Sequence, residues 1–394
     1  MINSLSETPN ANRVHITFFG RTNSGKSSVI NALVGQDIAI VSDFAGTTTD
    51  PVYKPVELHP LGPAVFIDTA GFDDTTELGK MRVMKTEETL DKTNLAVLVI
   101  TAGQKDFEKE YEWIETFKKR NLTFVVAVNK SDGGGEIPDF VSELDFVAVS
   151  AKTGKNIDKL RELIVRRVPA DIEAVSIVGH LVKKDDHVLL VAPQDIQAPK
   201  GRLILPQVQT IRDLLDHGAV VTVTTADLYM TALSKFSSPP DLIICDSQVF
   251  NEVYDSCPEG VPVTSFSILF ARFKGDIGTY LDGIERLNNL SSDAHIMILE
   301  ACSHNPLDMD ISRHKIPDAL RKKYGGTIKI DVYSGSDMPE NLEKYDLAIH
   351  CGGCMFNRAH VLNRIEKLKS AGVPVTNYGL FFANESGILD RVTI

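Results

Sequence analysis

The sequence predicts an α/β protein with mostly parallel sheets, divided into an N-terminal domain and two further α/β domains. Short, nearly continuous apolar segments alternate with amphipathic ones along the chain, which is typical of parallel strands that helices cover on both faces. The length of 394 residues exceeds what one hydrophobic core usually organises. Breaks in the pattern place the three domains at residues 1–172, 173–265 and 266–394.

The N-terminal domain begins with a strand, a glycine-rich loop and a helix, and further strands and helices alternate after them. Its last helix ends before Pro169, where we expect a domain boundary. The predicted strands are 13–19, 64–67, 95–100, 124–128 and 145–149, and the predicted helices are 26–33, 105–119 and 157–167.

The other two domains show the same alternation. The middle domain carries no motif typical of catalysis, so we assign it an architectural role in subunit association. We detect no internal repeat in the chain. For the middle domain we expect strands at 188–191, 220–223, 242–245 and 261–264 and a helix at 208–216. For the C-terminal domain we expect strands at 295–299, 327–330, 347–350 and 373–376 and helices at 280–290 and 358–370.

Composition and charge argue against several classes of protein. The net charge is −12 and the isoelectric point is near 5.3, which disfavours binding to nucleic acid by general attraction to phosphates. The polar N-terminus has no secretory pattern, and no apolar run approaches the length of a membrane span. Five cysteines are a low and odd count, which disfavours a disulfide framework, and we expect Cys245 and Cys257 to be buried thiols. We therefore expect a cytoplasmic protein without membrane contact.

A complete phosphate-binding loop follows the first strand, at Gly20-Arg21-Thr22-Asn23-Ser24-Gly25-Lys26-Ser27. The backbone N–H groups of such a loop and of the helix after it surround phosphate oxygens. Lys26 would contact the β- and γ-phosphates, and Ser27 would donate its hydroxyl oxygen to Mg²⁺. The nucleotide-binding residues that we assign here are Gly20, Asn23, Ser24, Gly25, Lys26, Ser27 and Ser28.

Two later segments carry residues for magnesium and the γ-phosphate. Thr48, in Gly46-Thr47-Thr48-Thr49-Asp50, can reach Mg²⁺ from a mobile loop. Asp68-Thr69-Ala70-Gly71 ends a predicted strand, so Asp68 can hold Mg²⁺ through water and the Gly71 N–H can sense the γ-phosphate. Phe72 follows, where many such proteins have a glutamine that positions water. We assign catalytic roles to Lys26, Thr48 and Gly71.

Two further segments predict that the base is guanine. A carboxylate at Asp132, in Asn129-Lys130-Ser131-Asp132, can accept hydrogen bonds from N1–H and the 2-amino group of guanine. Ser150-Ala151-Lys152 can close the base pocket with a backbone N–H to O6. The ligands that we expect are GTP, GDP and Mg²⁺, and the base-site residues are Asn129, Lys130, Asp132, Ser150, Ala151 and Lys152.

These five segments, in this order, resemble the translation-factor-like small GTPases, and most closely the tRNA-modification and Era-like subgroup. The resemblance covers residues 13 to about 168. It implies a P-loop GTPase domain, followed here by two further α/β domains with mostly parallel sheets. It also implies that Asn23 helps to hold a K⁺ ion, and that GTP hydrolysis is slow, is stimulated by potassium and alters the segments 37–50 and 72–84.

A candidate metal motif lies near the C-terminus: Cys302-x-His304, then His350-Cys351-x-x-Cys354. Because Cys302 and Cys351 follow two predicted strands, they lie at one sheet edge if those strands are parallel neighbours. Cysteines at this spacing in a reducing compartment favour a metal centre, either tetrahedral zinc or a 4Fe-4S cluster. The candidates for a fourth ligand are His304, His350, a carboxylate such as Glu300, and water.

The complete arrangement resembles the FeFe-hydrogenase maturation GTPases, the HydF family, over its full length. The resemblance implies a 4Fe-4S cluster on Cys302, Cys351 and Cys354 and a scaffold that carries the two-iron precursor of the hydrogenase active site. It implies immature FeFe-hydrogenase and radical-SAM maturases as partners, and a homodimer formed through the middle domain. The alternative is a regulatory or tRNA-modification-type GTPase with structural zinc. The acidic charge, and the absence of the C-terminal cysteine motif of the tRNA-modifying relatives, disfavour that alternative.

Overall fold

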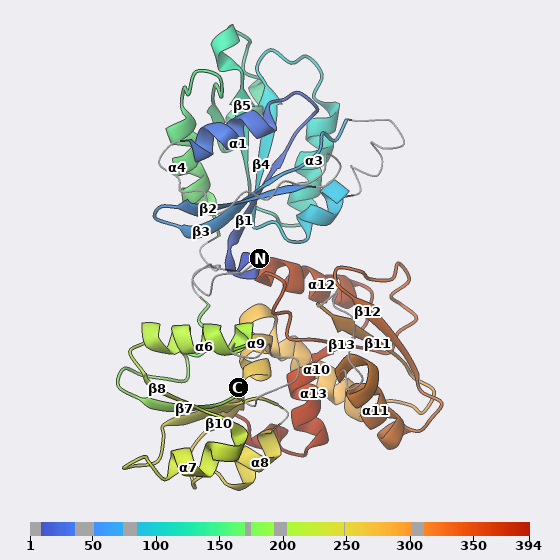
Figure 1. Ribbon diagram of the computed structural model, residues 1–394. Helices are drawn as coiled ribbons and strands as arrows, with labels where there is room; N and C mark the ends of the chain where they lie inside the picture. Colours follow the sequence, from blue (N-terminus) through green and yellow to red (C-terminus); the bar gives the residue numbers. More distant parts are fainter. Residues whose placement is uncertain are drawn as a thin grey trace. The chain divides into compact units, whose positions relative to one another are not determined.

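A computed structural model of the chain describes residues 9–35, 51–73, 85–169, 175–192, 203–247, 249–301 and 311–394. Contacts divide the chain into two compact units, Met1–Ala174 and Val175–Ile394. Each unit consists of mostly or fully parallel β-sheet flanked by helices (Figure 1), which confirms the predicted α/β class. Among the described residues, no helix is long and apolar enough to cross a membrane.

The first unit contains one six-stranded sheet with the order β2-β3-β1-β4-β5-β6. Its strands are parallel except for the antiparallel pair β2–β3. The central strand β1 is buried at every position, because helices cover both faces of the sheet. The strands are β1 (Val14–Phe19), β2 (Val52–Leu58), β3 (Gly62–Asp68), β4 (Leu95–Thr101), β5 (Phe124–Asn129) and β6 (Phe146–Ala148).

The two faces of this sheet have separate hydrophobic clusters. Alternate side chains of β1 point to opposite faces: Ile16 and Phe18 join one cluster with α1 and α4, and Phe19 joins the other with α3. These clusters hold the loops at the carboxyl ends of the strands in place. The helices are α1 (Lys26–Val34), α3 (Glu108–Lys119) and α4 (Ile157–Arg167).

The second unit contains two four-stranded sheets, both fully parallel. Their orders are β10-β9-β7-β8 and β12-β11-β13-β14, so both follow the same order of first to fourth strand, 2-1-3-4. The expectation that the chain has no internal repeat is therefore wrong. The strands are β7 (His187–Val191), β8 (Val220–Thr224), β9 (Leu242–Cys245), β10 (Val263–Ser265), β11 (His295–Glu300), β12 (Lys329–Ser334), β13 (Leu347–His350) and β14 (Val375–Asn377).

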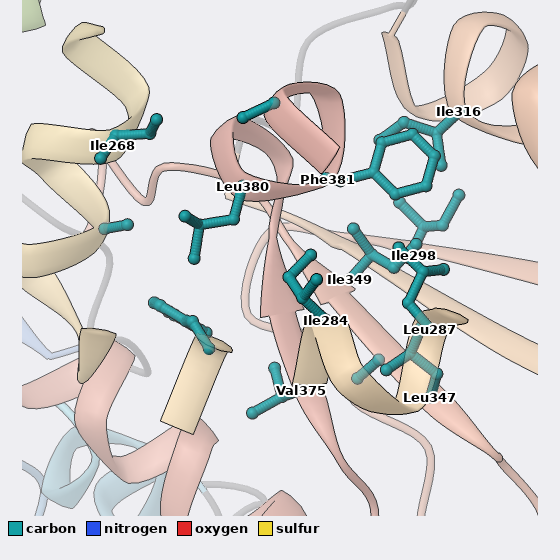
Figure 2. Packing of buried hydrophobic residues seen from close by; sticks show 14 of the residues in the cluster. Ile268, Ile284, Leu287, Ile298, Ile316, Leu347, Ile349, Val375, Leu380 and Phe381 are labelled. Atoms are coloured by element: carbon teal, nitrogen blue, oxygen red, sulfur yellow. The ribbon is translucent and has the colours of Figure 1, made fainter. Parts of the chain in front are cut away.

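One hydrophobic cluster joins both sheets of the second unit. Figure 2 shows members of this cluster from three elements: Leu380 and Phe381 of α13, Ile284 of α10 and Val375 of β14. Ile268 of α9 belongs to the same cluster. The domains predicted at 173–265 and 266–394 thus share a core. The helices are α6 (Leu205–Asp216), α7 (Tyr229–Leu233), α8 (Phe250–Asp255), α9 (Phe266–Lys274), α10 (Ile277–Asn288), α11 (Ile316–Tyr324), α12 (Arg358–Ser370) and α13 (Tyr378–Glu385).

Each predicted strand and helix exists, but several ends differ from the prediction. The strand expected at 327–330 is 329–334, and the helix expected at 280–290 is 277–288. The sequence analysis missed the edge strand β2, whose apolar pattern is interrupted by Pro55. A proline is tolerated at a sheet edge, where its missing N–H breaks no ladder. It also missed α13, whose short apolar segment directly follows β14.

Candidate nucleotide site and metal loop

The phosphate-binding loop runs from the end of β1 to the start of α1, at the carboxyl edge of the first sheet. Its shape depends on Gly25, which has a positive φ of 92°. A Cβ atom on Gly25 would overlap Asn129 Nδ2, so a larger residue would clash as well as strain the backbone. A Cβ on Gly20 would likewise overlap the Val99 carbonyl oxygen.

Lys26, the first residue of α1, is only 7% exposed. Its ammonium donates hydrogen bonds to the carbonyls of Gly20 (2.9 Å) and Arg21 (3.1 Å) within the loop. Burial lowers the pKa of Lys26, while the nearby carboxylates of Asp68 and Asp73 oppose that shift. The cation is thus held against the loop that would surround the phosphates.

Ser27 and Asp68 have the chemistry of a magnesium site. The Ser27 hydroxyl donates to Asp68 Oδ2 at 2.5 Å, and Asp68 Oδ1 is buried without a hydrogen-bond partner among the described residues. Burial raises the pKa of Asp68, and the Ser27 bond and the Lys26 charge oppose that rise. A half-buried, incompletely paired carboxylate beside a hydroxyl fits the oxygen ligands that Mg²⁺ prefers.

The Asp-Thr-Ala-Gly segment lies directly against the phosphate-binding loop. A Cβ on Gly71 would lie 2.5 Å from the Thr22 backbone nitrogen, so this contact requires glycine. The Thr22 N–H donates to Asp73 Oδ1 at 2.6 Å. Phe72 is buried, and its ring stacks on Trp113 with centroids 5.4 Å apart. It therefore lies in the core and has no group to orient a water.

Asn129 connects the phosphate-binding loop to the base loop. Its Nδ2 donates to Ser24 O (3.0 Å), and its Oδ1 accepts from the Ala151 N–H (3.1 Å). Lys130 donates to Asn23 O at 2.8 Å. The predicted base-site residues are therefore assembled around the loop by side-chain bonds between segments that lie far apart in sequence.

Asp132, the residue that we assign to guanine, is exposed and follows Lys130 in a short turn. A hydrogen bond from the Ser150 side chain is the largest cause of its lowered pKa. The carboxylate is therefore held as an anion beside the base loop, as the acceptor for guanine N–H groups must be.

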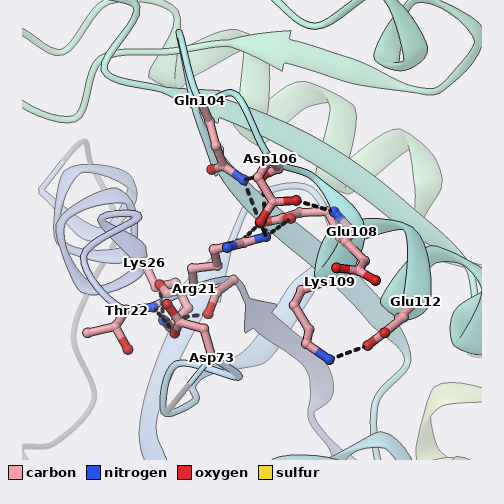
Figure 3. Close-up of polar contacts among 11 residues, drawn as sticks. Arg21, Thr22, Lys26, Asp73, Gln104, Asp106, Glu108, Lys109 and Glu112 are labelled. Carbon is pink, nitrogen blue, oxygen red and sulfur yellow. Dashed lines mark hydrogen bonds and ion pairs between the residues drawn. The ribbon is translucent and has the colours of Figure 1, made fainter. Parts of the chain in front are cut away.

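Arg21 has a role that the sequence analysis did not identify. Its guanidinium makes two hydrogen bonds to Glu110 of α3, at 2.8 and 3.1 Å. It makes two more to Asp106, at 3.0 Å to the carboxylate and 3.3 Å to the backbone carbonyl (Figure 3). Glu110 is fully buried and also accepts from Gln104. This bidentate pair fixes the phosphate-binding loop to α3. No local signal predicts it, because the partners are 89 residues apart.

The structure describes some, but not all, of the residues predicted for the nucleotide site. Thr48 and the segments 37–50 and 74–84 lie outside the described residues. Asn23 is exposed in a left-handed conformation, with φ of 62°. Ser28 on α1 and Lys152 in the base loop are also exposed.

The second candidate site lies at the carboxyl edge of the last sheet. β11 and β13 are parallel neighbours, and Leu299 pairs with His350, which confirms the condition for bringing the cysteine segments together. The Cys351 sulfur accepts N–H bonds from Ala301 (3.0 Å) and Gly353 (3.4 Å). A sulfur that accepts two amide bonds is suited to carry the charge of a metal-bound thiolate. Cys302 and His304 lie outside the described residues.

His350 is fully buried, and both of its ring nitrogens have polar contacts. Nδ1 lies 2.6 Å from Cys351 O, and Nε2 lies 3.4 Å from Arg364 Nη1. Because arginine can only donate, Nε2 accepts and Nδ1–H donates to the carbonyl. Burial, with the nearby Arg364 charge, lowers the pKa of His350 to about 4. These contacts favour a structural role for His350 over a role as fourth ligand.

Glu300 is also held by other groups. Its carboxylate accepts hydrogen bonds from Ser312 (2.6 Å) and Ser334 (2.5 Å), and Arg313 lies 3.5 Å away. These bonds tie the end of β11 to β12 and to the turn before α11. Serving as a metal ligand would therefore cost Glu300 some of these bonds.

The fold and the first site define a class of protein. A phosphate-binding loop after the first strand and a base loop after the fifth are typical of a P-loop GTPase. In this chain two parallel sheets with their helices follow that domain. Residues 15–130 match the model of the 50S ribosome-binding GTPase family. Residues 177–275 match the hydrogen maturase F dimerization domain, and residues 278–393 match the hydrogen maturase F tetramerization domain. The chain belongs to the hydrogen maturase F family, which confirms the resemblance inferred from the sequence.

Curated relatives that match part of the chain are GTPases. GTPase Der of Nautilia profundicola is 36% identical over 167 residues, which are 39% of this chain and 36% of that protein. The tRNA modification GTPase MnmE of Aquifex aeolicus is 31% identical over 253 residues, which are 60% of this chain and 55% of that protein. The chain thus spans about a third of the length of the first relative and about half of the second.

Solved structures give only a distant likeness. A single-residue variant of Era from Aquifex aeolicus, bound to GDP.AlF4⁻, aligns with a TM-score of 0.33 at 19% identity, over 54% of this chain and 92% of that chain. The G domain of the FeoB iron transporter of T. maritima aligns with a TM-score of 0.32 at 20% identity, over 40% of this chain and 99% of that chain.

Proposed function

We propose that this protein is a GTP hydrolase and an iron–sulfur scaffold, which assembles and delivers the two-iron precursor of the FeFe-hydrogenase active site. The observation that carries the metal part is the convergence of the β11 and β13 ends, where Cys351 accepts two amide N–H bonds. Cys302, Cys351 and Cys354 would hold a 4Fe-4S cluster, whose open iron could accept a further group. Immature hydrogenase and radical-SAM maturases would be its partners in the cytoplasm.

The GTPase domain would act as the switch of this scaffold. Lys26 would neutralise phosphate charge, while Ser27, Thr48 and Asp68 would hold Mg²⁺, which supplies further positive charge to the phosphates. Gly71 packs against Thr22 of the phosphate-binding loop. A γ-phosphate bound at that loop would therefore change the conformation of the segment after Gly71. The GTP and GDP states would then differ in the contacts they offer to partner proteins.

Metal analysis tests this proposal directly. The protein would be purified without oxygen, iron, acid-labile sulfide and zinc would be quantified per chain, and the reduced sample would be examined by electron paramagnetic resonance. We expect roughly four iron and four sulfide per chain and a reduced-cluster signal. Stoichiometric zinc without sulfide would contradict the scaffold proposal and favour the alternative, a GTPase with a structural zinc site.

Potassium should accelerate hydrolysis through Asn23. Asn23 is exposed in the phosphate-binding loop, and its backbone carbonyl is held by Lys130. We expect K⁺ to raise kcat over Na⁺ and Asn23→Ala to remove most of that increase, because the ion would stabilise charge that develops in the transition state. GTP turnover in the two salts at equal ionic strength measures this. Equal stimulation of both proteins would exclude Asn23 as the ligand.

We further propose that the middle domain forms a homodimer through the open edge at β8, in agreement with the match to a dimerization domain. Among the described residues, β8 pairs with β7 and has no strand on its other side. In the part of the chain that the structure describes, eight large apolar residues are exposed, and five of them lie between 215 and 230: Leu215, Val220, Val223, Leu228 and Met230. Exposed apolar edges of this kind favour pairing with another chain.

Val223→Lys is expected to convert the dimer to monomers. Val223 is 44% exposed on β8, so the lysine costs the monomer little, whereas burial of an unpaired charge in an interface costs several kcal/mol. Light scattering after size exclusion gives the mass. Lys235→Ala, on the exposed segment after α7, is the control and should remain dimeric. A dimeric Val223→Lys variant would place the interface elsewhere.

A further inference from the structure

The second unit is built from two copies of one fold. Beyond their common strand order, the pairing registers agree. Val188 pairs with Leu242 in the first sheet, as Ile296 pairs with Leu347 in the second. The outer strands obey the same relation, with the pairs Ile243–Val263 and Ala348–Val375 and the pairs His187–Val220 and His295–Lys329.

Polar contacts repeat as well. The N–H of His187, which begins β7, donates to Asp241 Oδ2 at 2.8 Å, and the N–H of His295, which begins β11, donates to Asp346 Oδ2 at 2.9 Å. At the other end of the sheets, the Asp246 N–H bonds to Val191 O as the Cys351 N–H bonds to Leu299 O. Cys351 of the metal loop thus occupies the position of Asp246 in the first copy.

The sequence repeats at the end of each copy. Gly-Val-Pro-Val-Thr occurs at 260–264 and at 372–376, and each is followed by a polar residue that caps a helix, α9 or α13. Ser267 and Gly379 are equivalent positions, and a Cβ on Gly379 would lie 2.6 Å from Ser267 Oγ. Contact between equivalent positions means that a quasi-twofold axis passes between α9 and α13.

This symmetry brings the last helix of each copy to the strand ends of the other. At the strand ends of the first copy, a small cavity is lined by Ser247 and Ser265 of that copy and by Gly379, Phe382 and Ser386 on and just after α13 of the second. By the same relation, α9 of the first copy must face the metal loop of the second. Lys274 is the residue equivalent to Ser386.

Contacts at the metal loop agree with that relation. Lys274, the last residue of α9, is 2% exposed, and its Nζ donates to Phe356 O at 2.8 Å. Arg358 in turn donates to the carbonyls of Phe273 and Gly275 at the end of α9. Burial lowers the pKa of Lys274 to about 8, and the nearby charge of Cys354 opposes that shift. A buried ammonium from the first copy is therefore bonded to the backbone of the second copy at Phe356, two residues after Cys354.

We propose that Lys274, which belongs to the first copy, is a positioning residue of the metal site in the second copy. Its fixed positive charge would stabilise the negative charge of the thiolate-bound metal. The inference rests on the proposed metal-binding function. Cys351 and Cys354 are half-buried, and a metal bound by several thiolates keeps a net negative charge, which a neighbouring buried cation stabilises. The hydrogen bond to Phe356 O keeps the ammonium at the loop, so its charge acts on the site without Lys274 being a ligand.

Removal of the charge should change the metal site in a measurable way. Lys274→Met keeps an unbranched side chain, one atom shorter, and removes the cation, whereas Lys274→Arg keeps the cation. We expect the cluster of the Lys274→Met protein to have a more negative reduction midpoint potential, because the reduced cluster loses a neighbouring positive charge. Affinity for Co²⁺, used as a probe that needs no cluster assembly, should fall roughly tenfold. Lys274→Arg should restore both properties in large part.

The experiment compares the full-length wild type with both variants and with Lys322→Met, a control at an exposed position of α11. The readouts are the midpoint potential by redox titration, Co²⁺ binding by thiolate absorption, and thermal unfolding. A wild type that binds neither a cluster nor Co²⁺ would overturn the proposed function and this inference with it. A loaded wild type with an unchanged potential and Co²⁺ affinity in Lys274→Met would overturn the inference alone. If Lys274→Met fails to fold, wild-type values in Lys274→Gln would overturn it equally.

Discussion

The Lys26→Ala variant is expected to lose at least about 100-fold in GTP turnover while it keeps its metal. Removal of one group that stabilises transition-state charge typically costs 10²–10³ in kcat, and Lys26 is the buried cation of the phosphate-binding loop. In the structure its ammonium also bonds to the carbonyls of Gly20 and Arg21. Alanine therefore removes both the phosphate contact and two internal bonds of the loop.

Phosphate release under saturating GTP measures the effect, and iron analysis of the same sample measures metal retention. Lys119→Ala, at the exposed end of α3, serves as the control and should retain wild-type turnover. Arg21 still holds the loop to Glu110 through two hydrogen bonds, so the variant should fold. Loss of iron together with turnover would show that the two sites are structurally coupled, and the switch proposal would then need revision.

Contiguous motifs made the nucleotide site predictable. Lys26 begins α1, Asp68 and Asn129 end β3 and β5, and Gly71 follows β3 by three residues. Pairing of the strands brings these ends to one edge. The same reasoning placed Cys351 near the end of β11, because strands that are buried on both faces have clear apolar patterns. The order of local signals was therefore enough to predict the fold and the meeting of these segments at one edge of the sheet.

Contacts between distant side chains were not predictable in this way. The Arg21–Glu110 pair joins residues 89 positions apart, and neither residue type is unusual on an α/β surface. His350 was a candidate ligand from its place beside Cys351, but a sequence cannot show that its ring is buried against Arg364. The internal repeat was missed because few identities remain outside the Gly-Val-Pro-Val-Thr segments, whereas strand register preserved it.

Cys351→Ser is expected to abolish the cluster and leave GTP turnover close to the wild-type value. A serine hydroxyl is a poor ligand for iron in this setting, where soft thiolates are preferred. The Ala301 and Gly353 N–H groups that bond to the sulfur would point at a neutral hydroxyl instead of a thiolate. The nucleotide residues belong to the other compact unit, so their chemistry does not depend on this sulfur.

Cys257→Ser provides the matched control for that experiment. Cys257 is a half-buried thiol whose sulfur lies near the carbonyls of Pro258 and Val261, and nothing in its surroundings resembles the amide contacts of Cys351. Burial raises the pKa of this thiol, which disfavours the thiolate that a metal requires. We therefore expect full iron content in Cys257→Ser and none in Cys351→Ser, measured per chain after anaerobic reconstitution. Unchanged iron in Cys351→Ser would remove this residue from the ligand set, since the amide contacts would then serve the loop rather than the metal.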